Sequence, residues 1–172
     1  MKLTAILALG IALFTVQITY AQHPNVLIGT DNSPNEPSIC INPKNPQQVV
    51  AGANIDNIYY SNDGGSSWTQ TPVNCPWGVW GDPVIGVDTT GAFLFLHLSN
   101  PPTPGNWIDR IIAQKSTDGG QNWSPGSFMG LNGTKAQDKH WIATDWKTNT
   151  LYVTWTQFDN YGTTASADSS II

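Results

Sequence analysis

The sequence predicts an all-β fold, a β-propeller of four-stranded antiparallel blades, on the strength of three observations. Only 11% of the 172 residues are charged, against roughly 25% in an average soluble domain, while Gly, Pro and Trp rise to 16, 12 and 8 residues. Short alternating apolar runs recur between turn residues. Three of these runs align as an internal repeat with the period of one blade. Long solvated helices and coiled coils are therefore disfavoured.

The first 21 residues have the pattern of a secretory signal peptide. Lys2 is followed by an apolar stretch from Leu3 to Val16, and Thr19 and Ala21 supply small residues at a cleavage site. That stretch is shorter than the ~18 residues that a membrane-spanning helix needs. We therefore expect a signal peptide over residues 1–21, a partial propeller domain over 22–172, no membrane span after signal removal, and a secreted, periplasmic or cell-surface location.

The repeat is a short strand that ends in Asn or Asp, followed by a turn and a second strand. Its copies span residues 36–42, 82–88 and 139–145 and end at Asn42, Asp88 and Asp145. Such a terminal residue suits an Asx-turn, in which the side chain bonds the backbone two residues on. Second strands are expected over Val49 to Asn54, Ala92 to Leu98 and Leu151 to Gln157. The spacings of 46 and 57 residues fit one four-stranded blade.

Two nearly identical octets mark the turn from the third to the fourth strand of a blade. They occupy residues 61–68 and 116–123, share the pattern Ser-x-Asp-Gly-Gly-x-x-Trp, and follow third strands at 58–60 and 111–114. The glycines permit positive φ in a tight turn, the Asp and Ser side chains can bond turn amides, and the Trp packs into the blade. We therefore expect structural roles for Ser61, Asp63, Gly65, Trp68, Ser116, Asp118, Gly120 and Trp123.

This motif resembles the Asp-box, or BNR repeat, of sialidase-like β-propellers, and the resemblance covers residues 25–172. It implies a glycan-directed function; in the enzymes of that superfamily three arginines grip the substrate carboxylate, an acidic residue is the acid/base, and a glutamate activates a tyrosine nucleophile. Asn35 stands here where the first of those arginines is expected, and Arg110 is the chain's only arginine. An amide cannot replace a bidentate guanidinium clamp, so the catalytic set is incomplete within this chain.

The chain holds about two and a half blades by the repeat. Ile111 and Ile112 precede the second octet, and the chain ends at Ile171 and Ile172 in the equivalent place of the third blade. A propeller typically needs four or more blades to close, and an open set exposes strand edges. We therefore expect an N-terminal fragment whose partners include the remaining blades of the same chain, with a strand at Val26 to Gly29 that latches the ring.

Long connections on one face indicate where a ligand binds. They run over residues 74–81, 99–107, 129–139 and 158–169, and long loops on a rigid scaffold commonly carry function. Aromatic rings beside carboxylates suit a sugar, because rings stack on the apolar faces of pyranoses while acids accept hydrogen bonds from hydroxyls. The residues expected to contact substrate are Trp77, Trp80, Trp107, Arg110, His140 and Tyr161. For each Trp the alternative is that it packs a loop onto the propeller, and His140 equally suits a core histidine.

Three carboxylates at the starts of first strands, Glu36, Asp82 and Asp138, are the candidate catalytic groups. Glu36 is the chain's only glutamate and aligns with Asp82, so both should point toward a central channel. Paired carboxylates serve as acid and base in glycoside hydrolysis, and they equally bind a cation or hold loop amides. The spacing lacks the dense oxygen ligands of an EF-hand loop, so we expect neither a metal nor another cofactor.

Three functions stay open. The first is a secreted sialidase-like glycoside hydrolase, with most catalytic residues in the missing blades and this fragment alone inactive. The second is a non-catalytic propeller that binds a glycan or a protein, and the third is a scaffold or adhesin segment. Acidic residues outnumber Lys and Arg by 12 to 7 without any basic run, which disfavours nucleic acid and anionic membranes. The resemblance, together with the aromatic rings beside carboxylates, implies a glycan or glycoprotein as the partner. Cys40 and Cys75 permit a disulfide without requiring one.

Overall fold

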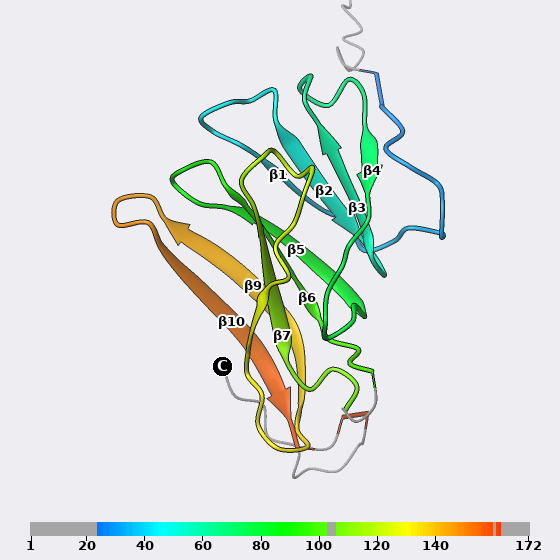
Figure 1. Cartoon of the computed structure of the whole chain (residues 1–172), viewed down its shortest axis with the longest axis vertical. Helices are drawn as coiled ribbons and strands as arrows, with labels where there is room; N and C mark the ends of the chain where they lie inside the picture. Colours follow the sequence, from blue (N-terminus) through cyan, green and yellow to red (C-terminus); the bar gives the residue numbers. More distant parts are fainter. Residues whose placement is uncertain (1–23, 103–105, 160, 163–172) are drawn as a thin grey trace, which may run out of the picture.

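The computed structural model describes residues 24–102, 106–159 and 161–162, and every regular element in these ranges is a β-strand (Figure 1). The first sheet contains β1 (Ser38–Ile41), β2 (Val49–Ala53), β3 (Asn57–Ser61) and β4 (Thr69–Thr71). The second contains β5 (Gly81–Val87), β6 (Phe93–Leu98), β7 (Ile111–Ser116) and β8 (Ser127–Met129). The third pairs β9 (Ala136–Asp145) with β10 (Thr150–Phe158). The expected signal peptide lies outside the described residues.

Each sheet is an antiparallel meander in which consecutive strands are neighbours. The all-β class and the four-stranded antiparallel sheets are therefore confirmed, and the strands fall where the repeat predicts them. None of the sheets closes on itself within the described ranges. Among those residues, no helix is long and apolar enough to cross a membrane.

One predicted strand is wrong. Residues 26–29 have no strand conformation, and Gly29 lies against the ring of Tyr59, so close that an added Cβ would be 2.6 Å from that ring. Tyr59 belongs to β3, an inner strand of the first sheet. The segment therefore crosses the face of the sheet, where it cannot exchange ladder hydrogen bonds, because those bonds lie in the plane of the sheet.

The three sheets stack face to face, with the first strand of each beside the first strand of the next (Figure 1). β5 is the middle member and contacts both β1 and β9. The amide of Ile85 donates to Ser38 Oγ of β1 at 3.0 Å, and Thr144 Oγ1 of β9 donates to the Val87 carbonyl at 2.8 Å. These bonds fix the offset between neighbouring sheets.

Two apolar clusters fill the spaces between the sheets. The cluster between the first and second sheets contains Val50, Ile58, Ile85, Val87, Phe93 and Phe95. The cluster between the second and third contains Val84, Leu94, Leu96, Leu98, Ile108, Ile111 and Ala136. The middle sheet contributes side chains to both, which is why every residue of β6 is buried. The first strands are thereby held at fixed positions relative to one another.

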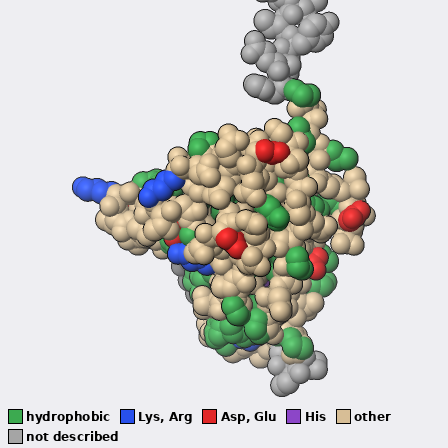
Figure 2. Space-filling view, turned by 45° about the horizontal axis from the view of Figure 1, so that its top comes forward, with side chains coloured by type: hydrophobic (Ala, Val, Ile, Leu, Met, Phe, Trp, Pro, Cys, Tyr) green, Lys and Arg blue, Asp and Glu red, His purple; other side chains and the backbone are tan. Residues whose placement is uncertain are grey.

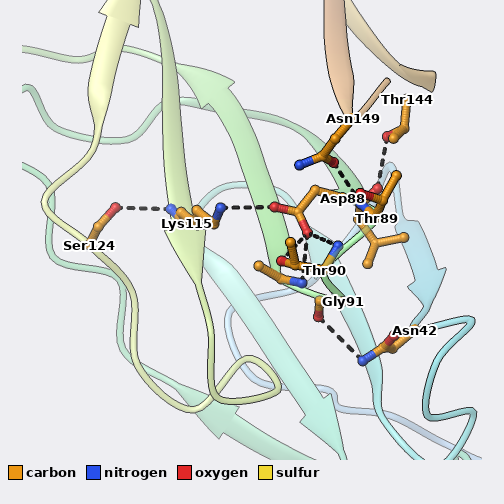
Figure 3. Close-up of polar contacts among 11 residues, drawn as sticks. Asn42, Asp88, Thr89, Thr90, Gly91, Lys115, Ser124, Thr144 and Asn149 are labelled. Atoms are coloured by element: carbon orange, nitrogen blue, oxygen red, sulfur yellow. Dashed lines mark hydrogen bonds and ion pairs between the residues drawn. The ribbon is translucent and has the colours of Figure 1, made fainter. Parts of the chain in front are cut away.

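The turns after the first strands have the Asx geometry that the repeat predicts. The side-chain oxygens of Asn42, Asp88 and Asp145 accept from the amides two residues on, at 3.0, 2.8 and 2.8 Å. Figure 3 shows that the same turns also join neighbouring sheets. Asn42 Nδ2 donates to the Gly91 carbonyl at 3.3 Å, and the Thr89 amide donates to Asn149 Oδ1 at 2.9 Å. Each sheet is thus tied to the next at this edge.

Asp88 is the most heavily bonded of these turn residues. Its Oδ1 accepts from the amides of Thr90 and Ala92, and its Oδ2 pairs with Lys115 Nζ at 2.8 Å (Figure 3). Burial opposes the charged form, yet the hydrogen bonds from Lys115, Thr90 and Ala92 together lower the pKa of Asp88 to about 2. The Asp88 carboxylate therefore stays ionised and holds the turn at any pH well above this pKa.

The two octets fold into the same hydrogen-bonded turn. In the second, Ser116 Oγ donates to Asp118 Oδ1 at 2.8 Å and accepts from the Gly120 amide at 2.9 Å, and Asp118 Oδ1 accepts from the Asn122 amide at 3.0 Å. The Trp123 indole donates to the Gly120 carbonyl at 3.1 Å. The equivalent bonds of the first octet join Ser61, Asp63, Gly65, Ser67 and Trp68. The expected turn chemistry accounts for both motifs.

Cys40 and Cys75 are both free thiols in the described part of the chain. Burial raises the pKa of each thiol above its ordinary value, and one backbone hydrogen bond on each partly opposes the shift. Because the two thiols are free, the disulfide that the sequence permits is not formed in this structure.

The second octet also contacts the preceding sheet. A Cβ added at Gly120, where φ is 93°, would lie 2.6 Å from Val50 Cγ2 and 3.0 Å from Tyr60 Cβ. Gly133 has a positive φ of 61° with nothing within 4 Å of an added Cβ. A substitution by alanine therefore incurs the cost of a positive φ at both positions, but it meets a steric clash only at Gly120.

We predict that Gly120→Ala lowers the free energy of unfolding by about 2–4 kcal/mol and Gly133→Ala by about 1 kcal/mol. The extra loss at Gly120 arises because the sheets must separate to admit a methyl group. Urea unfolding of the two variants beside the parent chain measures both values. Equal losses would show that the octet does not press on the first sheet.

Candidate functional site

The starts of the three first strands converge on one pocket of about 530 Å³. We call it the first-strand pocket, and its lining residues are Glu36, Pro37, Ser38, Ile39, Asp82, Pro83, Val84, Lys139, His140 and Trp141. Each sheet contributes the same part of the repeat. The adjacency of β1, β5 and β9 brings together residues that lie more than a hundred positions apart in the sequence.

The first position of each repeat copy has an unusual backbone conformation. Glu36, Asp82 and Lys139 have φ values of 49°, 51° and 49°, in the left-handed region that residues other than glycine rarely adopt. In β5 and β9 this position coincides with a register shift, between Gly81 and Val84 and opposite Thr154 to Thr156, where the first strand holds one extra residue. Bulges of this kind turn a side chain away from its regular direction and are common beside functional sites.

A lysine joins two of the three candidate carboxylates. Lys139 Nζ lies 2.7 Å from Asp82 Oδ2 and 3.7 Å from Glu36 Oε2. The hydrogen bond that Lys139 donates to Asp82 raises the pKa of Lys139, and the charges of Asp82 and Glu36 add to the effect. Lys139 and Glu36 are well exposed whereas Asp82 is largely covered. The pocket mouth therefore carries two carboxylates and one ammonium.

Two asparagines hold Asp82 in place. The Asp82 amide donates to Asn54 Oδ1 at 2.7 Å, and Asn54 Nδ2 donates to Asn35 Oδ1 at 3.0 Å. The Asn54 amide also donates to the Asn35 carbonyl at 2.8 Å. Asn35, which stands where an arginine is expected from the resemblance, thus links the first sheet to the start of β5.

His140 lies beneath the pocket and is 3% exposed. Burial lowers the pKa of His140 to about 4; backbone groups of Leu96 and Asp82 favour the protonated ring, but within the described residues neither ring nitrogen makes a well-formed hydrogen bond. His97 of β6 is fully buried nearby, with ring nitrogens 2.9 Å from the Leu98 carbonyl and 3.3 Å from Gln114 Oε1. Burial lowers the pKa of His97 to about 4 as well, and the charge of His140 adds to the shift. The burial of His140 fits the core alternative.

Four aromatic rings form a second group, which we call the aromatic cluster. Edge-to-face contacts join Trp80 to Trp107 at 5.4 Å, Trp107 to Tyr161 at 5.4 Å, and Tyr161 to Phe158 at 5.1 Å between ring centroids. Trp80, Trp107 and Tyr161 remain partly exposed despite these contacts. Hydrophobic side chains also gather at the lower end of Figure 2, the end that holds the loop after β6. The cluster is therefore both a packed unit and an accessible aromatic surface.

Asp138 connects the aromatic cluster to the first-strand pocket. Its Oδ2 accepts from the Tyr161 hydroxyl at 3.1 Å, and its Oδ1 accepts from the Lys139 amide at 2.8 Å. Burial and the Asp138 carboxylate raise the pKa of Tyr161 above its ordinary value. Asp138 is itself buried, so it positions its neighbours and is not presented at the pocket mouth.

Trp77 and Arg110 belong to neither group. Both pack on Phe128, Trp77 at 5.2 Å between centroids and Arg110 with its guanidinium carbon 4.8 Å from the ring centre. Arg110 donates from Nε and Nη2 to the two Asp109 oxygens, each at 2.7 Å. These contacts anchor the loop beside β7 and place the guanidinium outside the pocket lining.

The pocket thus brings together three of the expected site residues, Glu36, Asp82 and His140. Three more, Trp80, Trp107 and Tyr161, lie in the aromatic cluster. Asp138 links the two groups, because it bonds both Tyr161 and the Lys139 amide. Sequence reasoning missed Lys139, Trp141 and Asn54 as site residues. The alignment of Lys139 with Glu36 and Asp82 in the repeat carried the signal for it. Asn54 carried none, because its role depends on how two sheets meet.

No family model, curated protein or solved structure matches this chain.

Among the residues that the structure describes, no group of three or more His, Cys, Asp or Glu side chains is placed to hold a metal ion. The basic side chains on the face shown in Figure 2 form no continuous patch. The described lining of the pocket offers hydrogen bonds, the ion pairs of Lys139 with Asp82 and Glu36, and apolar contact.

We predict that the free energy of unfolding falls as the pH drops from about 6.5 to 4. His97 and His140 have pKa values of about 4 in the folded protein against an ordinary value of 6.5, so the unfolded chain binds more protons across that window. Each histidine contributes on the order of 3 kcal/mol to the loss. Urea unfolding at pH 7.0, 5.5 and 4.5 measures it.

His97→Gln is the informative variant for this pH dependence, because it removes one titrating ring from the buried pair. Its free energy of unfolding is expected to change less between pH 7.0 and 4.5 than that of the parent chain. The turn carboxylates do not confuse the comparison, since the pKa of Asp88 is about 2 and its contribution is lost only below pH 4. Parent stability that is constant from pH 7.0 to 4.5 would contradict the prediction.

Proposed function

We propose that this chain is part of a secreted, sialidase-like Asp-box β-propeller that binds glycans at the first-strand pocket. The observation that carries the proposal is the convergence of three equivalent repeat positions, Glu36, Asp82 and Lys139, on one accessible pocket beside an exposed tryptophan. Carboxylates and an ammonium offer acceptors and donors to sugar hydroxyls, and Trp141 offers a flat apolar surface to a pyranose ring.

The propeller part of the proposal is supported by sheet order and by the exposed outer faces. Each sheet presents its first strand to the next sheet, and the octet turn recurs with the same hydrogen bonds. Ile41 is exposed at one end of the stack and Tyr152 at the other, whereas Ile39 and Trp141 line the pocket. Apolar sheet faces of this kind are normally buried, so further blades of the same chain are the proposed cover.

Binding without chemistry is better supported than hydrolysis. Two-carboxylate glycoside hydrolysis needs one carboxyl group to donate a proton, whereas Asp82 and Glu36 share one ammonium as ion-pair partners. The pairing gives both carboxylates an electrostatic and hydrogen-bonding role. If the protein binds no glycan, the function proposed in its place is that of a protein-binding scaffold or adhesin.

A second candidate, exo-sialidase-type hydrolysis, is favoured by one contact. Tyr161 donates to the Asp138 carboxylate, a pairing similar to the tyrosine and acidic residue that the family resemblance implies. The same surroundings raise the pKa of Tyr161, which opposes its ionisation as a nucleophile near neutral pH. Turnover would therefore require groups from the remaining blades.

We predict that the full-length secreted protein binds members of a glycan array, and that Trp141→Ala and Asp82→Asn each weaken binding about tenfold or more, since each removes a contact at the pocket. Trp146→Ala is the matched control, because Trp146 lies in the turn at the opposite end of β9 and is 54% exposed, against 66% for Trp141. Fluorogenic sialosides and neutral glycosides assayed in parallel test for hydrolysis. Binding that survives both pocket variants would move the site elsewhere.

A further inference from the structure

We infer, on the basis of the proposed glycan-binding function, that the first-strand pocket takes a neutral or amine-bearing sugar and discriminates against sugars that carry a carboxylate. The inference names a ligand class for the pocket, and it follows from the charges and the partners of its lining residues.

The pocket carries a surplus of negative charge. Its titratable lining residues are Glu36, Asp82, Lys139 and His140. Lys139 already pairs with Asp82 at 2.7 Å and with Glu36 at 3.7 Å. His140 is buried and neutral at neutral pH. One negative charge therefore remains at the mouth of the pocket when no ligand is bound.

The groups that would grip a carboxylate are occupied elsewhere. Arg110, the chain's only arginine, is bound through two nitrogens to Asp109 and lies over Phe128. Asn35 Oδ1 accepts from Asn54, and Asn35 Nδ2 donates to the Ser33 carbonyl at 3.2 Å. A bidentate clamp for a ligand carboxylate is thus absent from the described lining of this pocket.

An acidic sugar would meet a cost that a neutral one avoids. A ligand carboxylate must either displace Asp82 from Lys139 or lie beside two carboxylates that repel it. Hydroxyl groups can instead donate to the outer oxygens of Asp82 and Glu36 while the ion pair with Lys139 persists. A sugar amine could pair directly with Glu36, whose carboxylate is more than half exposed.

The test uses matched pairs of methyl glycosides in the gluco, galacto and manno series, each pair a neutral hexoside and its C6 carboxylate. Titration calorimetry with the full-length secreted protein measures both members of each pair at pH 7. In every series that binds, the neutral sugar is expected to bind about tenfold tighter or more than its uronoside. The preference should narrow in 0.5 M NaCl, because salt screens repulsion between exposed charges.

Two variants connect the preference to the pocket. Asp82→Asn removes the better covered carboxylate, and Glu36→Gln removes the exposed one, which offers a second route should the first variant fail to fold. Each is expected to reduce the ratio of neutral to acidic affinity at least threefold, since it cancels the surplus charge. Trp146→Ala, at the far end of β9, is expected to leave the ratio unchanged.

The outcomes separate this inference from the proposed function. Equal affinity, or tighter binding of the uronosides or of a sialoside, would overturn the inference while glycan binding itself stood. A preference that neither carboxylate variant alters would also overturn it. Failure of every sugar, on these pairs and on the glycan array, would overturn the proposed function and the inference with it.

Discussion

Short polar side chains that close tight turns hold this structure together. The backbone amides of a turn between two strands have no ladder partner, so a side-chain oxygen that accepts from them fixes the path of the turn. Asn42, Asp88 and Asp145 supply this oxygen after the first strands, and Asp63 and Asp118 supply it after the third. Because some of these turns also bond to the neighbouring sheet, the chemistry that ends each strand sets the relation between sheets as well.

The candidate site is a consequence of that stacking. A repeat places equivalent residues at equivalent positions, and the contacts of β1 and β9 with β5 bring three such positions to one place. The same backbone conformation then carries Glu36, Asp82 and Lys139, whose side chains differ in charge and length. The ion pairs between them are contacts between copies of the repeat, and they exist only because the copies are adjacent.

Most of the fold and part of the site could be predicted from the sequence. Local patterns suffice for strands, Asx-turns and octets, because alternation and turn chemistry act over a few residues. The error at residues 26–29 has a different origin, since a short apolar run can lie against a sheet face without pairing, as Gly29 does against Tyr59. The partnership of Asp138 with Tyr161, and the separation of Trp77 and Arg110 from the pocket, depend on how loops from different sheets meet. Such contacts between distant loops cannot be predicted from a short stretch of sequence.

The extra residue in β5 and β9 gives the site an unusual independence from its scaffold. Because the residue stands outside the ladder, its side chain contributes neither to strand pairing nor to the clusters between the sheets. Exchange of one polar side chain for another at Asp82 or Lys139 would remove no side chain from the apolar clusters while it altered the charge at the pocket mouth. Such a frame can diversify its ligands through a few point substitutions, much as antibodies vary loops on a constant sandwich.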